Sequence, residues 1–216
     1  MHIEIWSDLV CPWCFIGKRQ LEIALEGFPH RDQVTVSHRA YQLNPNAETT
    51  TEPTTQMLAN KYGVDVEQAR EMLRNVTEVA ASVGLSYQLD RTLSGNTLDG
   101  HRLVLWAQAL DHDRGLRLLE DLLSAYFEQG QSIFEIEELS QFAGSAGFDA
   151  VAALEMLKGD EYSEQVRRDQ EIARALGCQG VPFFVIDERF GVTGAQPSEL
   201  FASALQQAWD AAAETP

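Results

Sequence analysis

The pattern of apolar and polar residues changes twice along the chain, from mixed strand and helix to helix alone and back again. Side chains alternate over 3–6 and again over 34–41, as they do in half-buried strands. Between these segments, apolar residues recur at helical spacing from Pro12 until Gly27 and Pro29 interrupt the pattern. The chain therefore opens with a strand, a helix and a strand, and such a unit requires its two strands to pair in parallel.

The middle of the chain has a helical pattern throughout. Residues 46–56 are rich in threonine, proline and glutamate and have the character of a connection. Beyond them, apolar residues keep a helical spacing and strand signals are almost absent. Helices are predicted over 56–62, 66–83, 97–111, 114–129, 135–146, 149–157 and 160–176. The pattern is broken at five glycines, namely Gly63, Gly84, Gly130, Gly147 and Gly177.

A short α/β pattern returns after the helical region. We therefore predict an α/β domain made of residues 1–50 and 177–216, interrupted by an all-helical insertion domain over 51–176. No internal repeat or low-complexity tract interrupts this plan. The elements that close the α/β domain are a strand over 181–186, its hairpin partner over 190–193 and a helix over 197–212.

Composition narrows the classes of function. Of the 216 residues, 44% are hydrophobic and 23% are charged, which is typical of a folded globular protein. The 33 acidic and 16 basic residues give a formal charge of −17, which opposes binding to a phosphate backbone, so we expect no nucleic-acid partner. Nothing before Trp6 resembles a signal peptide, and the sequence contains no stretch of about 18 apolar residues. We therefore expect a cytoplasmic protein with no membrane association. Nothing in the sequence predicts a particular oligomeric state.

A dithiol motif, Cys11-Pro12-Trp13-Cys14, stands at the start of the first predicted helix. Proline is tolerated in the first turn of a helix, and the positive helix end there favours the thiolate form of Cys11. Cys14 lies one turn inside the helix and would resolve a mixed disulfide by attacking Cys11. The motif therefore predicts a redox-active pair, with Pro12 and Trp13 setting how strongly its reduced form is favoured.

Two other interpretations of a single C-x-x-C remain open. Half of a zinc site is one, but the sequence has no second C-x-x-C and no H-x-x-x-H, so Cys178 and a histidine would have to complete it. A structural disulfide is the other, and a reducing compartment disfavours it. We favour a site without metal. Cys178 itself is most simply interpreted as a small buried hydrophobic residue. The alternative is that it is a third thiol that takes part in the exchange.

Weaker candidates lie around the motif. Trp13 would line the substrate surface or pack over its own loop. Asp8 has the character of a cap or turn residue, although its carboxylate could also influence the thiolate or receive a proton. Val181-Pro182 opens the late strand, and a proline is allowed at such an entry position without any functional reason.

Four segments of the sequence carry a specific pattern: 7–18, 96–103, 125–130, and 180–185 with 194–196. Together they resemble a known family, the FrnE-like branch of the DsbA-like thioredoxin-fold oxidoreductases. The resemblance spans nearly the whole chain and implies an α/β, thioredoxin-like fold with a large all-helical insertion domain. It also implies a cis peptide bond between Val181 and Pro182 beside the sulfurs, and pairing of the Val181 backbone with an extended substrate. Asn96 and His101 would contact substrate or glutathione; apart from the resemblance, Asn96 is a helix cap and His101 a surface residue.

The leading hypothesis is a protein disulfide oxidoreductase that exchanges the Cys11–Cys14 dithiol or disulfide with a cysteine-bearing protein or a small thiol. No tightly bound cofactor is expected, and glutathione is a candidate co-substrate. One alternative is a glutathione-dependent transferase or isomerase, like the kappa-class glutathione transferases and 2-hydroxychromene-2-carboxylate isomerases, which usually carry serine in place of Cys11. Another is a non-catalytic redox-sensing binding module.

Overall fold

The structure, a computed structural model, describes residues 1–48, 50 and 52–213. The chain forms two compact units, Met1–Leu43 with Arg167–Pro216, and Asn44–Val166. These boundaries differ from the predicted division at residues 50 and 176. The second difference arises because most of helix α8 (Ser163–Ala175) belongs with the sheet of the first unit and not with the helical segment that precedes it.

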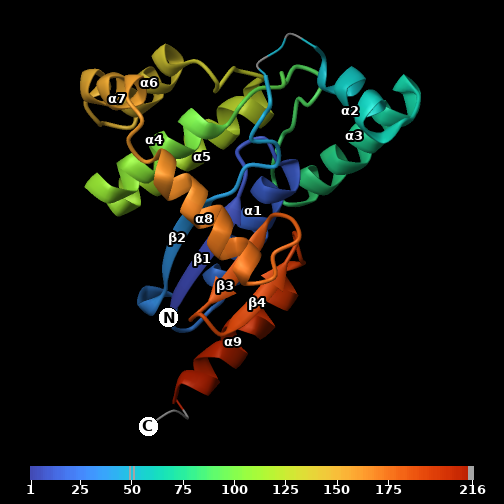
Figure 1. The fold of residues 1–216 in the computed structure, drawn as a ribbon. Coiled ribbons are helices and arrows are strands. Elements are labelled where there is room, and N and C mark those ends of the chain that lie inside the picture. Colours follow the sequence, from blue (N-terminus) through green and yellow to red (C-terminus); the bar gives the residue numbers. More distant parts are fainter. Residues whose placement is uncertain (49, 51, 214–216) are drawn as a thin grey trace. The chain divides into compact units, whose positions relative to one another are not determined.

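The first unit is built on a four-stranded sheet with the strand order β2-β1-β3-β4 (Figure 1). The parallel pairing predicted for the opening unit is confirmed, because β1 and β2 run parallel through their whole length. Strand β3 is antiparallel to both of its neighbours, so the late hairpin completes the sheet beside β1. The elements are β1 (His2–Ser7), α1 (Pro12–Glu26), β2 (Thr35–Ala40), β3 (Phe183–Ile186), β4 (Phe190–Thr193) and α9 (Ser198–Ala213).

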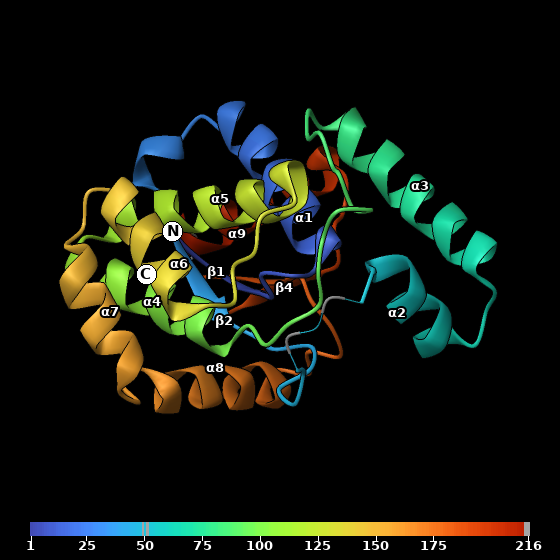
Figure 2. The same ribbon diagram turned by 90° about the horizontal axis from the view of Figure 1, so that it is seen from above.

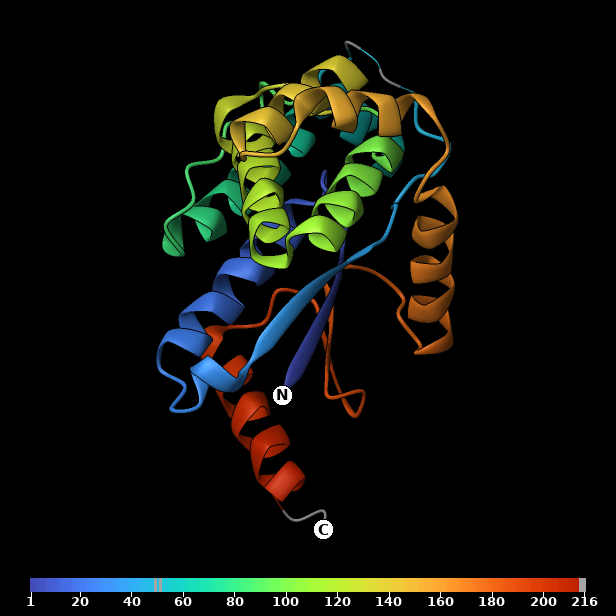
Figure 3. The same ribbon diagram turned by 90° about the vertical axis from the view of Figure 1, so that its left-hand side faces the viewer.

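Both faces of this sheet are covered by helices, as Figure 3 shows with α1 (blue) and α9 (red) on one side and α8 (orange) on the other. Alternate residues of a strand point to opposite faces, so Ile3 and Ile5 pack with α1 and α9. Trp6, on the other face, packs with Ala173 of α8. Because β3 has hydrophobic residues on both faces, it is buried at all four positions.

Helix α8 is tied to the sheet by a buried aspartate. The backbone carbonyl of Asp169 accepts a hydrogen bond from the Trp6 indole nitrogen at 2.8 Å, and its carboxylate accepts one from the Ala40 backbone at 3.0 Å. The same carboxylate pairs with Arg39 at 3.4 Å, and Asp169 is 1% exposed. These contacts to β1 and β2 explain why this helix belongs to the sheet unit.

The second unit is entirely helical in its regular elements within the described residues. Within it, α2 and α3 form a hairpin beside the layered helices α4–α7 (Figure 2). Every predicted helix is present, and each of the five predicted helix-ending glycines has a positive φ angle. None of the helices in the described ranges combines the length and apolarity needed to cross a membrane. The helices are α2 (Thr54–Tyr62), α3 (Val66–Ser82), α4 (Leu98–Leu110), α5 (His112–Gln129), α6 (Ile136–Ser145) and α7 (Ala150–Lys158).

Candidate active site

The dithiol lies where β1 turns into α1. Cys11 is the N-cap residue of α1 and Pro12 is its first helical residue. The turn is closed by two backbone hydrogen bonds, from the Cys11 N–H to the Asp8 carbonyl at 3.1 Å and from the Cys14 N–H to the Cys11 carbonyl at 2.9 Å. Cys11 is therefore held at the positive end of the helix.

The fold brings the Val181-Pro182 segment against this turn. The Cys11 thiol donates to the Val181 carbonyl oxygen, with sulfur and oxygen 3.7 Å apart. The peptide bond between Val181 and Pro182 is cis, and Pro182 accepts a hydrogen bond from the Gly194 N–H at 2.8 Å. The ladders of β3 with β1 and β4 both end at Phe183, so Val181 lies beyond the last paired residue of the sheet.

The two sulfurs have different surroundings. Cys11 and Cys14 are 4% and 2% exposed, whereas Trp13 between them is 42% exposed. Burial raises the pKa of the Cys14 thiol well above its ordinary value, and the hydrogen bond and negative charge of Cys11 raise it further. Cys14 therefore remains protonated near neutral pH.

The raised pKa of Cys14 predicts how stability depends on pH. Below the ordinary thiol pKa, Cys14 is protonated in both the folded and the unfolded chain, and its contribution to stability is constant. Above about pH 8.5 to 9, the unfolded chain loses the proton while the folded protein keeps it, so the free energy of unfolding falls by up to about 1.4 kcal/mol per pH unit. Urea unfolding of the reduced protein from about pH 7 to pH 10 measures this slope.

The matched control for this titration is Cys14→Ala, which removes the thiol and should give a shallower slope over the same range. Because Cys178 is present in both proteins, its own ionisation cancels in the comparison. Equal slopes in the two proteins would show that Cys14 ionises alike in the folded and unfolded states, contrary to the pKa inferred from its burial.

Asp8 stabilises the loop that precedes the dithiol through hydrogen bonds. It is 1% exposed, and its carboxylate accepts a hydrogen bond from the Leu43 N–H at 2.7 Å. Its backbone carbonyl accepts the Cys11 N–H, as described above. The side chain thus joins the dithiol turn to the segment that follows β2. Asp8 acts on the pKa of Cys14 in two opposite ways: a hydrogen bond from its backbone lowers this pKa, and the smaller effect of its negative charge raises it.

Comparison with known proteins decides the family. The model of the DSBA-like thioredoxin domain matches residues 2–206. The chain belongs to the DsbA-like thioredoxin domain family. Membership and the thioredoxin-like fold with its helical insertion, both predicted from the sequence, are thereby confirmed. The FrnE-like branch within the family stays a prediction.

Two solved structures and one further protein resemble this chain over at least 90% of their own length. The probable DsbA oxidoreductase from Streptomyces coelicolor has 41% sequence identity and a TM-score of 0.91, with 97% of this chain and 90% of the other covered. The cytosolic disulfide reductase DsbM from Pseudomonas aeruginosa shares the fold at 17% identity and a TM-score of 0.68, covering 96% and 98%. The Bacillus subtilis protein YwbO is 23% identical over 218 residues, which cover 95% of this chain and 96% of that protein.

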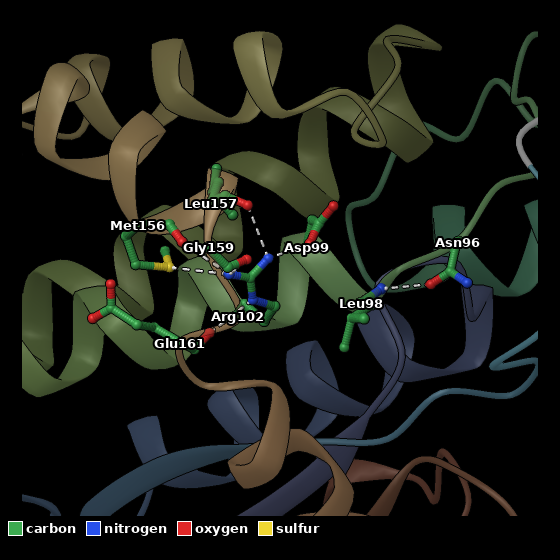
Figure 4. A network of polar contacts seen from close by, with 8 residues as sticks. All are labelled: Asn96, Leu98, Asp99, Arg102, Met156, Leu157, Gly159 and Glu161. Carbon is green, nitrogen blue, oxygen red and sulfur yellow. Dashed lines mark hydrogen bonds and ion pairs between the residues drawn. The ribbon is translucent and has the colours of Figure 1, made fainter.

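Asn96 and His101 of this DsbA-like protein lie at the start of α4. The Asn96 carbonyl oxygen accepts the Leu98 N–H at 2.9 Å (Figure 4), and its amide donates to the Pro45 carbonyl at 2.9 Å. The Asn96 side chain thus lies just before the N-cap residue Thr97, accepts the N–H of the first residue of α4, and ties this end of the helix to the segment before α2. The interpretation of His101 as a surface residue is wrong, because it is 0% exposed on a helix that is buried from Gly100 to Ala107.

Arg102 is a buried charge whose role the sequence pattern does not reveal. All five guanidinium N–H groups donate hydrogen bonds. Four of these bonds go to backbone carbonyls, and the fifth goes from Nη1 to the Asp99 carboxylate at 2.6 Å (Figure 4). Its side chain is 4% exposed. An arginine inside an apolar helical run was the available signal, since such a charge needs many partners. The carbonyl acceptors, at 2.7 to 3.1 Å, belong to Met156, Leu157, Gly159 and Glu161.

Cys178 has the surroundings of a small buried hydrophobe. It is 7% exposed, packs in the cluster around Trp6 and donates from its thiol to the Gly180 carbonyl at 3.2 Å. Burial raises the pKa of this thiol, which disfavours a thiolate. All three cysteines are free thiols, and the described ranges contain no cluster of three or more metal-ligating side chains.

Proposed function

We propose that this DsbA-like protein is a thiol–disulfide oxidoreductase that works through a mixed disulfide on Cys11. Its substrate is a cysteine-bearing protein or a small thiol. The observation that supports this most directly is the position of Cys11 at the N-terminus of α1, 3.7 Å from the Val181 carbonyl, with Cys14 buried one turn further along.

In the reducing direction, the Cys11 thiolate attacks one sulfur of a substrate disulfide. The substrate S–S bond breaks, a mixed disulfide forms on Cys11, and the first substrate thiolate leaves and takes up a proton. Cys14 then gives up its proton and attacks the Cys11 sulfur, which releases the second substrate thiolate. Two electrons pass from the dithiol to the substrate, and the enzyme is left with a Cys11–Cys14 disulfide. The oxidising direction is the reverse of these steps.

The electrostatics of the pair favour this order of events. While Cys11 is a thiolate, its charge and its hydrogen bond keep the Cys14 proton in place. In the mixed disulfide Cys11 carries no charge, so both of these contributions disappear, while burial and the negative charge of Asp8 still raise the pKa of Cys14. Formation of the mixed disulfide thus makes the resolving thiol easier to ionise at the moment when its thiolate is needed.

The segment at Val181 supports the choice of substrate. A residue that lies beyond the last ladder pair of β3 offers backbone groups to an extended peptide, as in other cases of strand addition. We propose that a substrate strand containing the reacting cysteine pairs with Val181, and that exposed Trp13 contacts the side chains beside that cysteine. A flexible or unfolded segment satisfies this requirement better than a rigid surface.

Glutathione is the small thiol that we propose as co-substrate, which returns the enzyme disulfide to the dithiol. The related disulfide reductase from Pseudomonas aeruginosa was solved with GSH. A cytoplasmic location fits this chemistry, because glutathione keeps thiols reduced there. Isothermal calorimetry of the Cys14→Ser variant with reduced and oxidised glutathione tests the proposal, and absence of any reaction or binding contradicts it.

The activity is tested by insulin reduction, in which dithiothreitol supplies the electrons and precipitation of the insulin B chain is followed by turbidity. We expect the wild-type protein to shorten the lag well beyond the reagent alone. The Cys178→Ser variant should behave like wild type, because Cys178 has no part in the proposed exchange. A wild-type protein that leaves the lag of insulin precipitation unchanged would contradict the proposed activity.

A further inference from the structure

Gly17 lies one turn beyond Cys14 in α1 and faces the segment that carries the Val181 carbonyl. Gly17 is buried, and a Cβ atom there would lie 2.9 Å from Pro182 Cγ, 3.2 Å from Phe184 Cζ and 3.4 Å from Ala195 Cα. Carbon atoms in ordinary contact are about 3.5 to 4.0 Å apart. The helix and the Val181-Pro182 segment are therefore closer than any residue with a side chain would allow.

The atoms around Gly17 have little freedom to retreat. Pro182 Cγ belongs to a five-membered ring, and Ala195 contributes a backbone atom. Phe184 is fully buried and packs edge-on against Phe201, with ring centroids 4.7 Å apart. A methyl group at position 17 would thus have to move the helix away from the segment, because none of the three neighbours is the end of a flexible side chain.

The backbone conformation of α1 does not itself require glycine at this position. Gly17 lies inside the helix and is not among the glycines with a positive φ angle. Glycine is also a poorer helix former than alanine, so helical stability alone would favour alanine. The close approach to Pro182 is the structural feature that accounts for glycine here.

We propose that Gly17 is a positioning residue for disulfide exchange, because the absence of its side chain lets α1 hold Cys11 within 3.7 Å of the Val181 carbonyl. This inference rests on the proposed function. Substrate paired with Val181 reaches Cys11 in the correct orientation only while this separation is kept. Gly17 therefore controls the geometry of the exchange without touching the reacting sulfurs.

The test compares Gly17→Ala with Gly27→Ala, both in the Cys178→Ser protein. Gly27 caps the other end of α1, where an added Cβ would be 3.9 Å from its nearest neighbour. We expect Gly17→Ala to fold and to lose about tenfold in kcat/KM with a cysteine-bearing peptide disulfide, since small misplacements are costly in such reactions. Alkylation of Cys11 by iodoacetamide, which needs no contact with Val181, should change by less than about twofold. Gly27→Ala should match the parent in both assays.

A double-mutant cycle with Pro182→Ala locates the cause. Pro182→Ala removes the atom that Gly17→Ala would meet most closely, so Gly17→Ala should lower kcat/KM by less than about twofold in that background.

Three results would overturn the inference: unchanged exchange in Gly17→Ala, an equal loss of alkylation, or a variant that fails to fold. If the wild-type protein itself does not exchange disulfides, the proposed function fails, whereas an active wild type with an equally active Gly17→Ala overturns only the role of Gly17.

Discussion

Serine in place of Cys11 should lower the rate of insulin reduction by a factor on the order of a thousand or more, because a hydroxyl group can neither ionise at neutral pH nor form a disulfide. Serine has nearly the same shape as cysteine and its hydroxyl can still donate to the Val181 carbonyl. We therefore expect the variant to fold normally and its defect to lie in the chemical step. The assay is the turbidity measurement with dithiothreitol as reductant.

The control for this prediction is Cys178→Ser, which changes the third buried thiol in the same chemical way. It should retain nearly all activity, although it loses some packing around Trp6. Activity that survives in Cys11→Ser and disappears in Cys178→Ser would move the attacking thiol to Cys178 and contradict the proposed mechanism.

Methionine in place of Arg102 should destabilise the helical unit by about 2 to 4 kcal/mol. The substitution keeps an unbranched side chain but leaves four backbone carbonyls and the Asp99 carboxylate without their donor. The contacts to Met156 and Leu157 are buried, so the loss of their donor carries most of the cost, although the Met156 carbonyl keeps the Gly159 N–H at 3.2 Å. Asp99 is partly exposed and can be hydrated. Urea unfolding followed by far-UV circular dichroism measures the loss.

The matched control is Arg70→Met in α3. Arg70 also pairs with an acidic residue three positions away, Glu67, but its side chain is 60% exposed. Surface pairs of this kind contribute little, so we expect a change of less than about 0.5 kcal/mol. If the two variants unfold at the same urea concentration, the buried network around Arg102 does not stabilise the fold.

The order of elements could be predicted from the sequence because each carries a local signal. Alternation in β1 and helical spacing in α1 reflect which side chains face the core, and the glycine stops reflect a backbone that other residues rarely adopt. The polarity of the dithiol was also local, since the position of Cys11 at a helix start depends on only a few neighbouring residues. Short-range patterns thus predicted the order of elements in the first unit, the parallel pairing of β1 with β2 and the candidate dithiol.

Features that depend on distant contacts could not be predicted in this way. The closeness of Cys11 to Val181 joins residues far apart in the chain, and only the family resemblance suggested it before the structure. Gly17 was part of that resemblance without a physical role, which became visible from the distances to Pro182. His101 and Arg102 have polar side chains on a helix that tertiary packing buries. The sequence pattern alone therefore indicated a surface position for His101, which is wrong, and gave no indication of the role of Arg102.

The central claim is that Cys11 forms the mixed disulfide and Cys14 resolves it. The most direct measurement is to incubate reduced Cys14→Ser protein with oxidised glutathione or a peptide disulfide and to map the adduct by mass spectrometry after digestion. The account predicts a stable adduct of one substrate thiol on Cys11, removed by dithiothreitol, with Cys178 unmodified. An adduct on Cys178 alone, or no adduct on Cys11, would contradict it.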